Sequence, residues 1–235
     1  MTRLLLCFAA LLAVSTTAVT ARADFDDWTA VPEYTGSPEH FGLELRVGAY
    51  YPTGLGDLFT SSDYFGSDIG PDLSFELHYF PFRIDYIGLL GIGGGLGWSQ
   101  WDTESPGGTA NVDRNSFEIL NMRALLLWRF DTLARELNVP LVLTPKFGLD
   151  VGYWQTALGS ESPEDGWSIG PRFAGKVSLE LDFLEPRAAR QLDEEWGINH
   201  SEIFAEFHYS MAGEPAGGQL PINGWGWTLG LGFTF

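Results

Sequence analysis

Large apolar residues alternate with small or polar residues along most of this chain. The alternation is strictest at the C-terminus, where glycine and threonine separate Trp225, Trp227, Leu229, Leu231, Phe233 and Phe235. A period of two is typical of a β-strand with one apolar face. Read along the whole chain, it predicts eight strands, at residues 41–51, 73–79, 86–98, 120–130, 141–153, 167–183, 203–209 and 225–235.

The connections between these strands are of two kinds. Those after the first, third, fifth and seventh strands are rich in Gly, Ser and Asp and predict loops. After the second strand, Pro81-Phe82 predicts a short turn. Asp131–Leu137 and Arg187–Trp196 predict short helices, the second opened by Glu185-Pro186 and ended by Gly197. Both helices follow even-numbered strands and therefore lie at one end of an antiparallel sheet.

The two faces of the strands differ sharply in charge. On the apolar face the only charged residue is Glu118. The opposite face carries six bases and six acids: Arg46, Arg123, Arg129, Lys146, Arg172, Lys176, Glu44, Glu76, Asp150, Glu180, Asp182 and Glu206. A soluble barrel would turn these charges to water, whereas a barrel in lipid must turn them inward. The prediction is an all-β, eight-stranded antiparallel up-and-down transmembrane β-barrel with two short periplasmic helical turns.

Aromatic residues support this orientation because they gather near both ends of the apolar face. One group lies toward the loops: Tyr51, Trp98, Tyr153, Trp167, Tyr209 and Trp225. The other lies toward the turns: Phe41, Tyr79, Tyr86, Trp128, Phe130, Phe183 and Phe235. Two aromatic belts are typical of the two interfaces of a membrane barrel.

The first residues predict export. Arg3, the apolar run 4–14 and Ala21-Arg22-Ala23 form a secretory signal peptide over residues 1–23. Residues 24–39 lack periodicity and predict a periplasmic tether, and 40–235 form the barrel. The only cysteine, Cys7, lies in the signal peptide, so the mature chain has no disulfide.

The net charge of the mature chain indicates which kinds of partner it can bind. It has 11 basic and 31 acidic residues, a net charge of −20, which argues against nucleic acid. We expect a monomer in the bacterial outer membrane, with both termini periplasmic, facing lipid and lipopolysaccharide. The outer loops are acidic and could collect divalent cations at Glu161, Glu164 and Asp165, but the spacing of a calcium loop is absent and a solvated surface is favoured.

Two stretches resemble known sequences. Residues 185–200 (EPRAARQLDEEWGINH) and Phe204-Ala-Glu206, with Tyr64-Phe65-Gly66 and Trp128-Arg-Phe130, resemble small outer-membrane β-barrel proteins best known from myxobacteria and related Gram-negative bacteria. The last strand resembles the C-terminal signal that the barrel-assembly machinery reads, with Trp227, Leu229, Leu231, Phe233 and Phe235 as its apolar positions. The resemblance implies location and an OmpA-like or OmpX-like architecture, but no activity.

The inward charges are the main candidate site. Because an eight-stranded barrel has room only for its own side chains, the favoured interpretation is a salt-bridged, closed lumen with a structural or surface-interaction role. A narrow polar channel is the alternative. Glu206, His208 and Ser210 share the inward face, but residues two apart on a strand are almost 7 Å apart, so a lipid-modifying enzyme is disfavoured. No cofactor or metal is expected.

Two smaller expectations concern packing. On the second predicted helix, Leu192 and Trp196 form an apolar face with Ala188 and Ala189. This face predicts either a lid beneath the barrel mouth or a docking surface for a periplasmic partner. The glycines of the last strand, Gly226, Gly230 and Gly232, are expected to leave room for the long charged residues of the fourth to sixth strands.

Overall fold

The computed structural model describes residues 39–55, 69–104, 114–137, 139–157, 163–213 and 219–235, which fall within one compact unit. The predicted signal peptide, the tether up to residue 38 and the loop residue Glu161 lie outside the described residues. Secretion by the signal peptide and the division at residues 23 and 39 therefore stay predictions.

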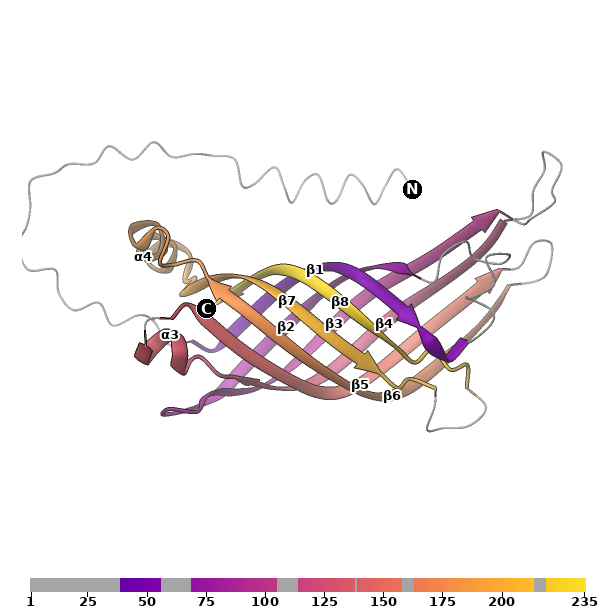
Figure 1. Ribbon diagram of the computed structural model, residues 1–235, viewed down its shortest axis with the longest axis horizontal. Coiled ribbons are helices and arrows are strands. Elements are labelled where there is room, and N and C mark those ends of the chain that lie inside the picture. Colours follow the sequence, from indigo (N-terminus) through magenta and orange to yellow (C-terminus); the bar gives the residue numbers. More distant parts are fainter. Residues whose placement is uncertain (1–38, 56–68, 105–113, 138, 158–162, 214–218) are drawn as a thin grey trace, which may run out of the picture. The chain divides into compact units, whose positions relative to one another are not determined.

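Eight strands form one closed antiparallel barrel in which each strand pairs with its neighbours in sequence, and the last pairs with the first (Figure 1). The closing pair runs from Gly42 opposite Thr234 to Pro52 opposite Gly224. The predicted fold class is confirmed. The strands are β1 (Phe41–Pro52), β2 (Gly70–Ile84), β3 (Gly88–Glu104), β4 (Arg114–Arg129), β5 (Leu141–Ala157), β6 (Glu164–Glu180), β7 (His200–Ser210) and β8 (Gly224–Thr234).

Two short α-helices follow even-numbered strands, as the sequence predicts. α3 (Thr132–Leu137) follows β4, and α4 (Pro186–Trp196) follows β6. The left-handed backbone of Gly197 (φ 68°) ends α4, since only glycine adopts this conformation without strain. Both helices lie at the barrel end that holds the C-terminus (Figure 1). A single 3-10 turn, η2 (Thr53–Leu55), follows β1. Among the described residues, no helix is long and apolar enough to span a bilayer.

The predicted turn at Pro81-Phe82 is wrong. β2 continues to Ile84, and the reversal falls at residues 85–87. The proline is accommodated by a shift in the β2–β3 register between Tyr79 and Phe82. A β-bulge tolerates proline within a strand because one ladder hydrogen bond is absent there anyway. Tyr86, at φ 63°, therefore lies in the turn and not in β3.

The strands differ in length around the barrel. β3, β5 and β6 have 17 residues each, whereas β7 and β8 have 11. Strands of 9–11 residues suffice to cross a bilayer core. The longer strands therefore extend as a partial wall beyond the end opposite the helices (Figure 1).

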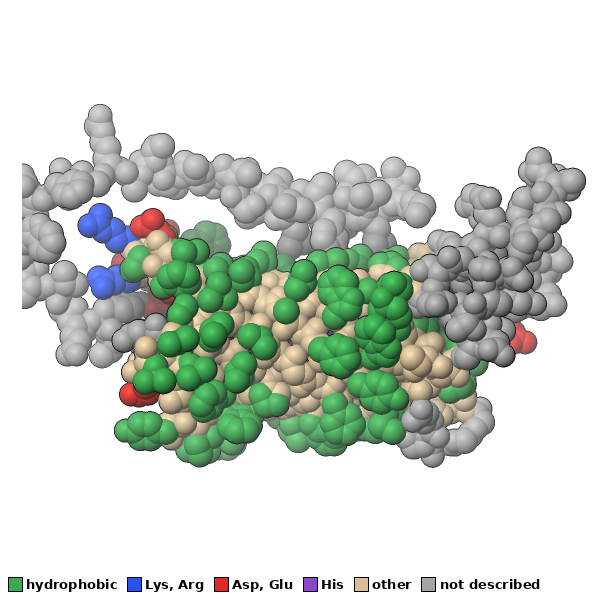
Figure 2. All heavy atoms as spheres, viewed as in Figure 1, with side chains coloured by type: hydrophobic (Ala, Val, Ile, Leu, Met, Phe, Trp, Pro, Cys, Tyr) green, Lys and Arg blue, Asp and Glu red, His purple; other side chains and the backbone are tan. Residues whose placement is uncertain are grey.

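On the face of the barrel shown in Figure 2, hydrophobic side chains are spread over the middle section of the wall, and acidic and basic side chains are seen only toward the two ends. Large exposed hydrophobic residues occur on every strand, including Val47, Leu77, Ile92, Leu126, Phe147, Val177, Phe207 and Leu229. Aromatic pairs lie on the wall at both ends: Tyr51 stacks on Trp225 toward the loops (3.9 Å between ring centroids), and Phe41 makes a tilted contact with Tyr79 toward the helices (5.3 Å). Along the middle of the strands, the charged side chains are buried and the outward-facing hydrophobic side chains are exposed.

Two apolar clusters fill the lumen near its ends, and the sequence pattern did not reveal either. At the loop end, Tyr50, Leu55, Trp101, Phe117, Ile119, Ala212 and Ile222 pack together, with Trp154 and Leu220 against them. Toward the helix end, Phe80, Leu89, Leu125 and Leu127 form a smaller cluster. Charged residues such as Lys146 and Glu76 lie between these two clusters, whereas Arg129, two residues beyond Leu127 on β4, lies nearer the helix end.

Candidate functional site: the charged lumen

Lys146 on β5 lies at the centre of the lumen. Its Nζ donates to Glu44 (2.9 Å) and Glu76 (2.6 Å) and lies 2.9 Å from an oxygen of Glu206. These three carboxylates come from β1, β2 and β7, so one ammonium joins four strands across the barrel. All four side chains are almost completely inaccessible to water. At such burial an ion is stable only when opposite charges surround it.

Arg46 provides the second bridge across the lumen. Its guanidinium pairs with Glu76 and Glu206 and donates a hydrogen bond to Thr228 (3.2 Å). The Phe204 ring lies beneath it, 5.5 Å from the guanidinium carbon, and also beneath Lys176 at 5.0 Å. An aromatic face stabilises a cation that has lost its water.

The network continues toward both ends of the barrel. Toward the helices, Lys176 pairs with Glu44 (2.7 Å) and Glu202, and Arg129 pairs with Glu202 (2.8 Å) and Glu180 (2.9 Å). Toward the loops, Arg172 pairs with Asp150 (3.0 Å). Arg123 donates to Glu76 at 3.1 Å. The central network, as we call these residues, consists of Glu44, Arg46, Glu76, Arg123, Arg129, Lys146, Asp150, Arg172, Lys176, Glu180, Glu202 and Glu206.

The structure brings eleven of the twelve predicted charges into this network, and Asp182 differs. Asp182 lies two residues beyond the end of β6 and pairs with His200 at the barrel mouth. Its place is taken by Glu202, which the sequence analysis missed because the seventh strand was expected to begin at residue 203. Glu202 precedes Glu206 by four residues, so the period-two pattern of β7, extended by one residue toward its start, predicts that Glu202 also faces inward.

Glycines allow the charged side chains to approach the wall closely. A side chain at Gly95 would lie 2.6 Å from Glu76, and one at Gly97 would lie 2.6 Å from Arg123. The glycines of β8 were expected to make room for charged side chains of the fourth to sixth strands. This expectation is wrong, since they make room for side chains of the adjacent β7. Gly226, Gly230 and Gly232 lie opposite His208, Phe204 and Glu202.

The described part of the lumen is closely packed. A cavity among Arg129, Lys176 and Glu202 has a volume of about 10 Å³, the size of one water molecule. At the loop end, Tyr50 donates to the carbonyl of Ile222, and Ser168 donates to that of Leu220 at 2.6 Å. These bonds hold the segment before β8 inside the wall as an apolar cap over the charges.

The other residues that could have formed a catalytic or metal site are already paired with neighbouring side chains. Glu206 is engaged by Arg46 and Lys146, while His208 stacks on Tyr50 at 6.0 Å, so Glu206 does not orient the imidazole. Glu44, Glu76 and His78 are spaced closely enough to ligate a metal, but Lys146 already contributes a positive charge to both carboxylates. Glu180, Asp182 and His200 form a second such group, at the mouth.

A second set of ion pairs surrounds the barrel mouth at the helix end. Glu39, just before β1, contacts Arg83 (2.7 Å), His200 (3.4 Å) and Arg135 (3.7 Å). The rim network, as we call this set, consists of Glu39, Arg83, Asp131, Arg135, Asp182 and His200. Burial opposes ionisation of Glu39, but the hydrogen bond to His200 and the nearby positive charges outweigh it and lower the pKa of Glu39 to about 2.

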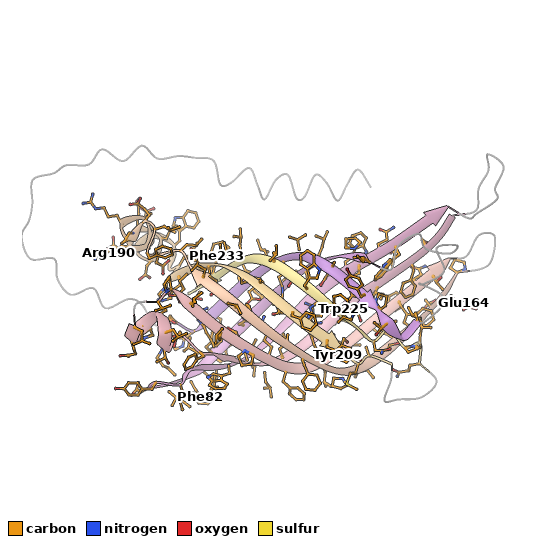
Figure 3. The ribbon with its side chains drawn as sticks, in the orientation of Figure 1. Phe82, Glu164, Arg190, Tyr209, Trp225 and Phe233 are labelled. Carbon is orange, nitrogen blue, oxygen red and sulfur yellow. The ribbon has the colours of Figure 1, made fainter. Side chains whose placement is uncertain are left out.

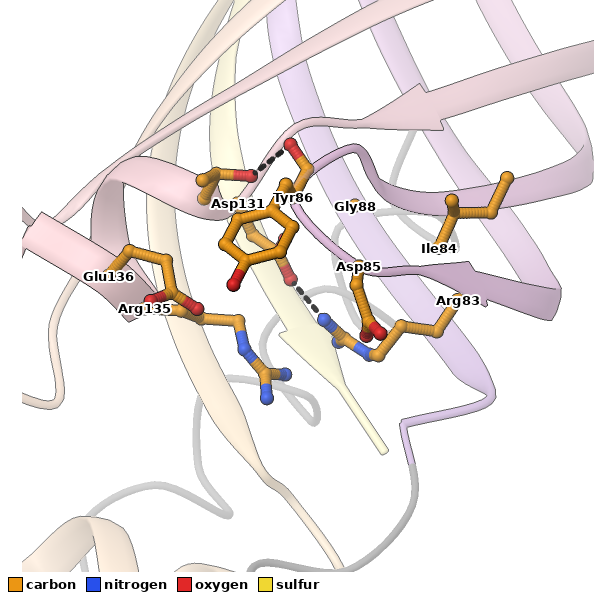
Figure 4. A pocket seen from close by; sticks show the side chains of 9 residues that line it. Arg83, Ile84, Asp85, Tyr86, Gly88, Asp131, Arg135 and Glu136 are labelled. Carbon is orange, nitrogen blue, oxygen red and sulfur yellow. Dashed lines mark hydrogen bonds and ion pairs between the residues drawn. The ribbon is translucent and has the colours of Figure 1, made fainter.

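A polar pocket of about 190 Å³ lies beside the rim network, between the β2–β3 turn and α3 (Figure 4). Arg83 donates to Asp131 at 2.9 Å, and Thr132 donates to the carbonyl of Tyr86 at 2.9 Å. Arg135 and Glu136 complete its wall. The acidic and basic side chains that line the pocket pair with one another, and these contacts connect α3 to the β2–β3 turn.

Among the described residues, none covers the apolar face of α4. No residue of α4 is buried, and Trp196 is 69% exposed. The lid interpretation is therefore wrong for Leu192 and Trp196, because neither packs beneath the mouth. The predicted assembly positions of β8 face outward, with Trp227, Leu229 and Leu231 exposed and Phe233 on the outer wall near the helix end (Figure 3).

Comparison with solved structures supports the fold. The outer-membrane protein OprG from Pseudomonas aeruginosa superimposes with a TM-score of 0.55 at 13% identity, covering 85% of this chain and 98% of OprG. Neisserial surface protein A (TM-score 0.47, 14% identity, 83% and 96% coverage) and Ail of Yersinia pestis in complex with sucrose octasulfate (0.48, 11%, 84% and 98%) are more distant. The chain shares the fold of OprG. No protein-family profile and no curated protein matches the sequence, so the narrower myxobacterial resemblance stays a prediction.

Proposed function

We propose that this protein is an integral outer-membrane β-barrel with a closed, salt-bridged lumen, and that its role is structural or in surface interaction. One observation carries the proposal: the strands bury the charged side chains of the central network and expose large hydrophobic side chains on their outer face. In water this arrangement would expose several large apolar patches, each a site of aggregation. In a bilayer the same wall meets hydrocarbon, and the closed barrel leaves no strand edge with unpaired backbone groups facing lipid.

The proposal includes an orientation and partners. Both termini and the two helices face the periplasm, and the longer strands and acidic loops face outward, toward lipopolysaccharide. The likeness to OprG, an outer-membrane protein, supports the location. The barrel-assembly machinery would read the outward residues of β8 from Trp227 to Phe235. The protein acts as a monomer and carries no catalytic site.

The location is tested by gel migration and protease treatment. The folded protein should migrate differently before and after boiling, as stable barrels do. Protease added to whole cells should cut only the connections after β1, β3, β5 and β7. Migration that boiling does not change, or cleavage within 186–196 in intact cells, would contradict the proposal.

A narrow polar channel is the second candidate, favoured by the unbroken series of ion pairs along the lumen. The apolar cap around Tyr50 and Ile222 and the one-water cavity near Lys176 oppose it. Planar-bilayer recordings decide between the two, because a closed lumen should give no conductance above that of the lipid. A Lys146→Ala variant in the same recordings tests whether removal of the central ammonium opens a path.

A further inference from the structure

The helix α4 presents an apolar stripe that nothing in the described part of the chain covers. With 100° per residue, Ala188, Leu192 and Trp196 lie along one side, and Arg187, Arg190 and Glu194 lie opposite. The least exposed members of α4 are Ala189 and Asp193, which places the barrel on the side next to the stripe. The stripe therefore faces neither the barrel nor the direction of the arginines.

The base of α4 is fixed to the barrel rim on both sides. Before the helix, Leu181 donates to the carbonyl of Ser201 at 2.8 Å, and the carboxylate of Asp182 pairs with His200. After the helix, the backbone N–H of Asn199 donates to the carbonyl of Thr234, at the end of β8, at 2.7 Å. These bonds hold α4 at the height of the strand ends.

The position of α4 relative to the barrel axis excludes a plug. Figure 1 shows α4 beside the end of the barrel, away from its axis. Arg190 points away from the barrel (Figure 3). Phe183 and Leu184, in the turn between β6 and α4, are 53% and 65% exposed, so exposed apolar side chains follow one another along the chain from the outer wall of β6 to the helix.

We propose that α4 lies in the periplasmic interface of the bilayer and inserts the Ala188, Leu192 and Trp196 stripe among the lipid headgroups and upper acyl chains. This inference rests on the proposed membrane location of the barrel. Amphipathic helices bind in this way, with the apolar face buried about 5–10 Å, and tryptophan is enriched at this depth. Because exposed apolar residues lead from the lipid-facing wall to this stripe, lipid is favoured over a periplasmic protein as what covers the stripe.

The charge of the helix determines the kind of attraction. Two arginines are offset by Asp193, Glu194 and Glu195, so α4 carries a net charge of −1. Its attachment is therefore hydrophobic, and salt should not release it, because screening weakens only the electrostatic part of membrane binding.

Site-specific fluorescence in lipid vesicles tests the inference. The mature chain has no cysteine of its own, because Cys7 lies in the predicted signal peptide. An environment-sensitive dye is therefore attached to the single cysteine of three separate variants, Leu192→Cys, Glu194→Cys and Leu229→Cys. Lipids that carry a nitroxide high on the acyl chain should quench the dye at position 192, at low and at high salt. The dye at position 194 should instead be quenched by iodide in the buffer.

The Leu229→Cys variant separates the two proposals because Leu229 lies on the middle of the barrel wall. Quenching at 229 by a mid-chain nitroxide, together with iodide quenching at 192, would overturn the inference about α4 and leave the membrane barrel intact. Iodide quenching at both 192 and 229 would overturn the proposed function itself. Shallow-nitroxide quenching at 192 and mid-chain quenching at 229 support both.

Discussion

The central network and the rim network contain ion pairs of the same length in different surroundings. Lys146 and Glu44 approach to 2.9 Å in the lumen, and Arg83 and Asp131 approach to 2.9 Å at the mouth. The Lys146 side chain is 0% exposed, whereas that of Arg83 is 30% exposed. Because water screens exposed pairs and replaces a lost partner, burial and not distance decides how much each pair matters.

Removal of the central ammonium should have the largest effect. Lys146→Met removes one of the two cations that each contact Glu44, Glu76 and Glu206 and leaves only Arg46 to pair with all three buried carboxylates. Loss of one partner from a buried ion pair destabilises proteins by about 3–5 kcal/mol. The measurement is urea unfolding of the barrel in lipid vesicles, followed by tryptophan fluorescence. A loss below about 1 kcal/mol, the range of exposed pairs, would contradict the account.

A charge placed on the outer wall should have the next largest effect. Leu229 is 51% exposed in the middle of β8, where the proposal puts hydrocarbon. Leu229→Arg should destabilise the barrel by about 2–4 kcal/mol in vesicles, the cost of arginine at the bilayer midplane. Leu229→Met serves as the control with nearly unchanged stability. Equal stability of the arginine and methionine variants would show that this wall does not face lipid.

The matched substitution at the mouth should be mild. Arg83→Met removes an ion-pair partner of Glu39 and Asp131, as Lys146→Met does in the lumen. Since the vacated space opens to water, the expected loss is about 1 kcal/mol or less. The same urea unfolding measures it. A loss as large as that of Lys146→Met would erase the distinction between the two networks.

The rim network should also respond to acid. The pKa of Glu39 is lowered to about 2, below its value in the unfolded chain. A carboxylate of this kind contributes its stability above the unfolded pKa and loses it as pH falls toward 2. The difference in stability between the wild type and Glu39→Gln should therefore be full at pH 7 and shrink below about pH 4.5. A pH-independent difference would show that Glu39 is not held ionised by its neighbours.

The two networks also differ in how far the sequence predicted them. The central network follows from strand periodicity, because a charge such as Lys146 occupies an inward position whatever its partner. The rim network does not follow from strand periodicity. Glu39, Arg83 and His200 lie at strand ends and in connections, where the alternation of apolar and polar residues does not extend. These residues come into contact only because closure of the barrel brings together strand ends that are far apart in the sequence.

The apolar residues of the lumen were hidden for a related reason. On β4, Phe117, Ile119, Leu125 and Leu127 point inward while leucines also point outward, so the alternation of polarity is lost there. Only the folded barrel shows that Ile119 and Ile222 belong to one buried cluster. For α4, the sequence identified the apolar face of Leu192 and Trp196 but not its surroundings, because a helical pattern does not specify what lies opposite.

The central claim, that charges face inward and hydrocarbon faces outward, is tested most directly by contacts between methyl groups and lipid. In deuterated protein with protonated methyl groups, placed in lipid nanodiscs, nuclear Overhauser effects from acyl chains should reach the methyls of Val47, Leu77, Leu149 and Leu231 on the outer wall. They should be absent from Ile119, Leu125, Leu127 and Val142, which are buried inside. Acyl-chain contacts at the second set, or their absence at the first, would contradict the account.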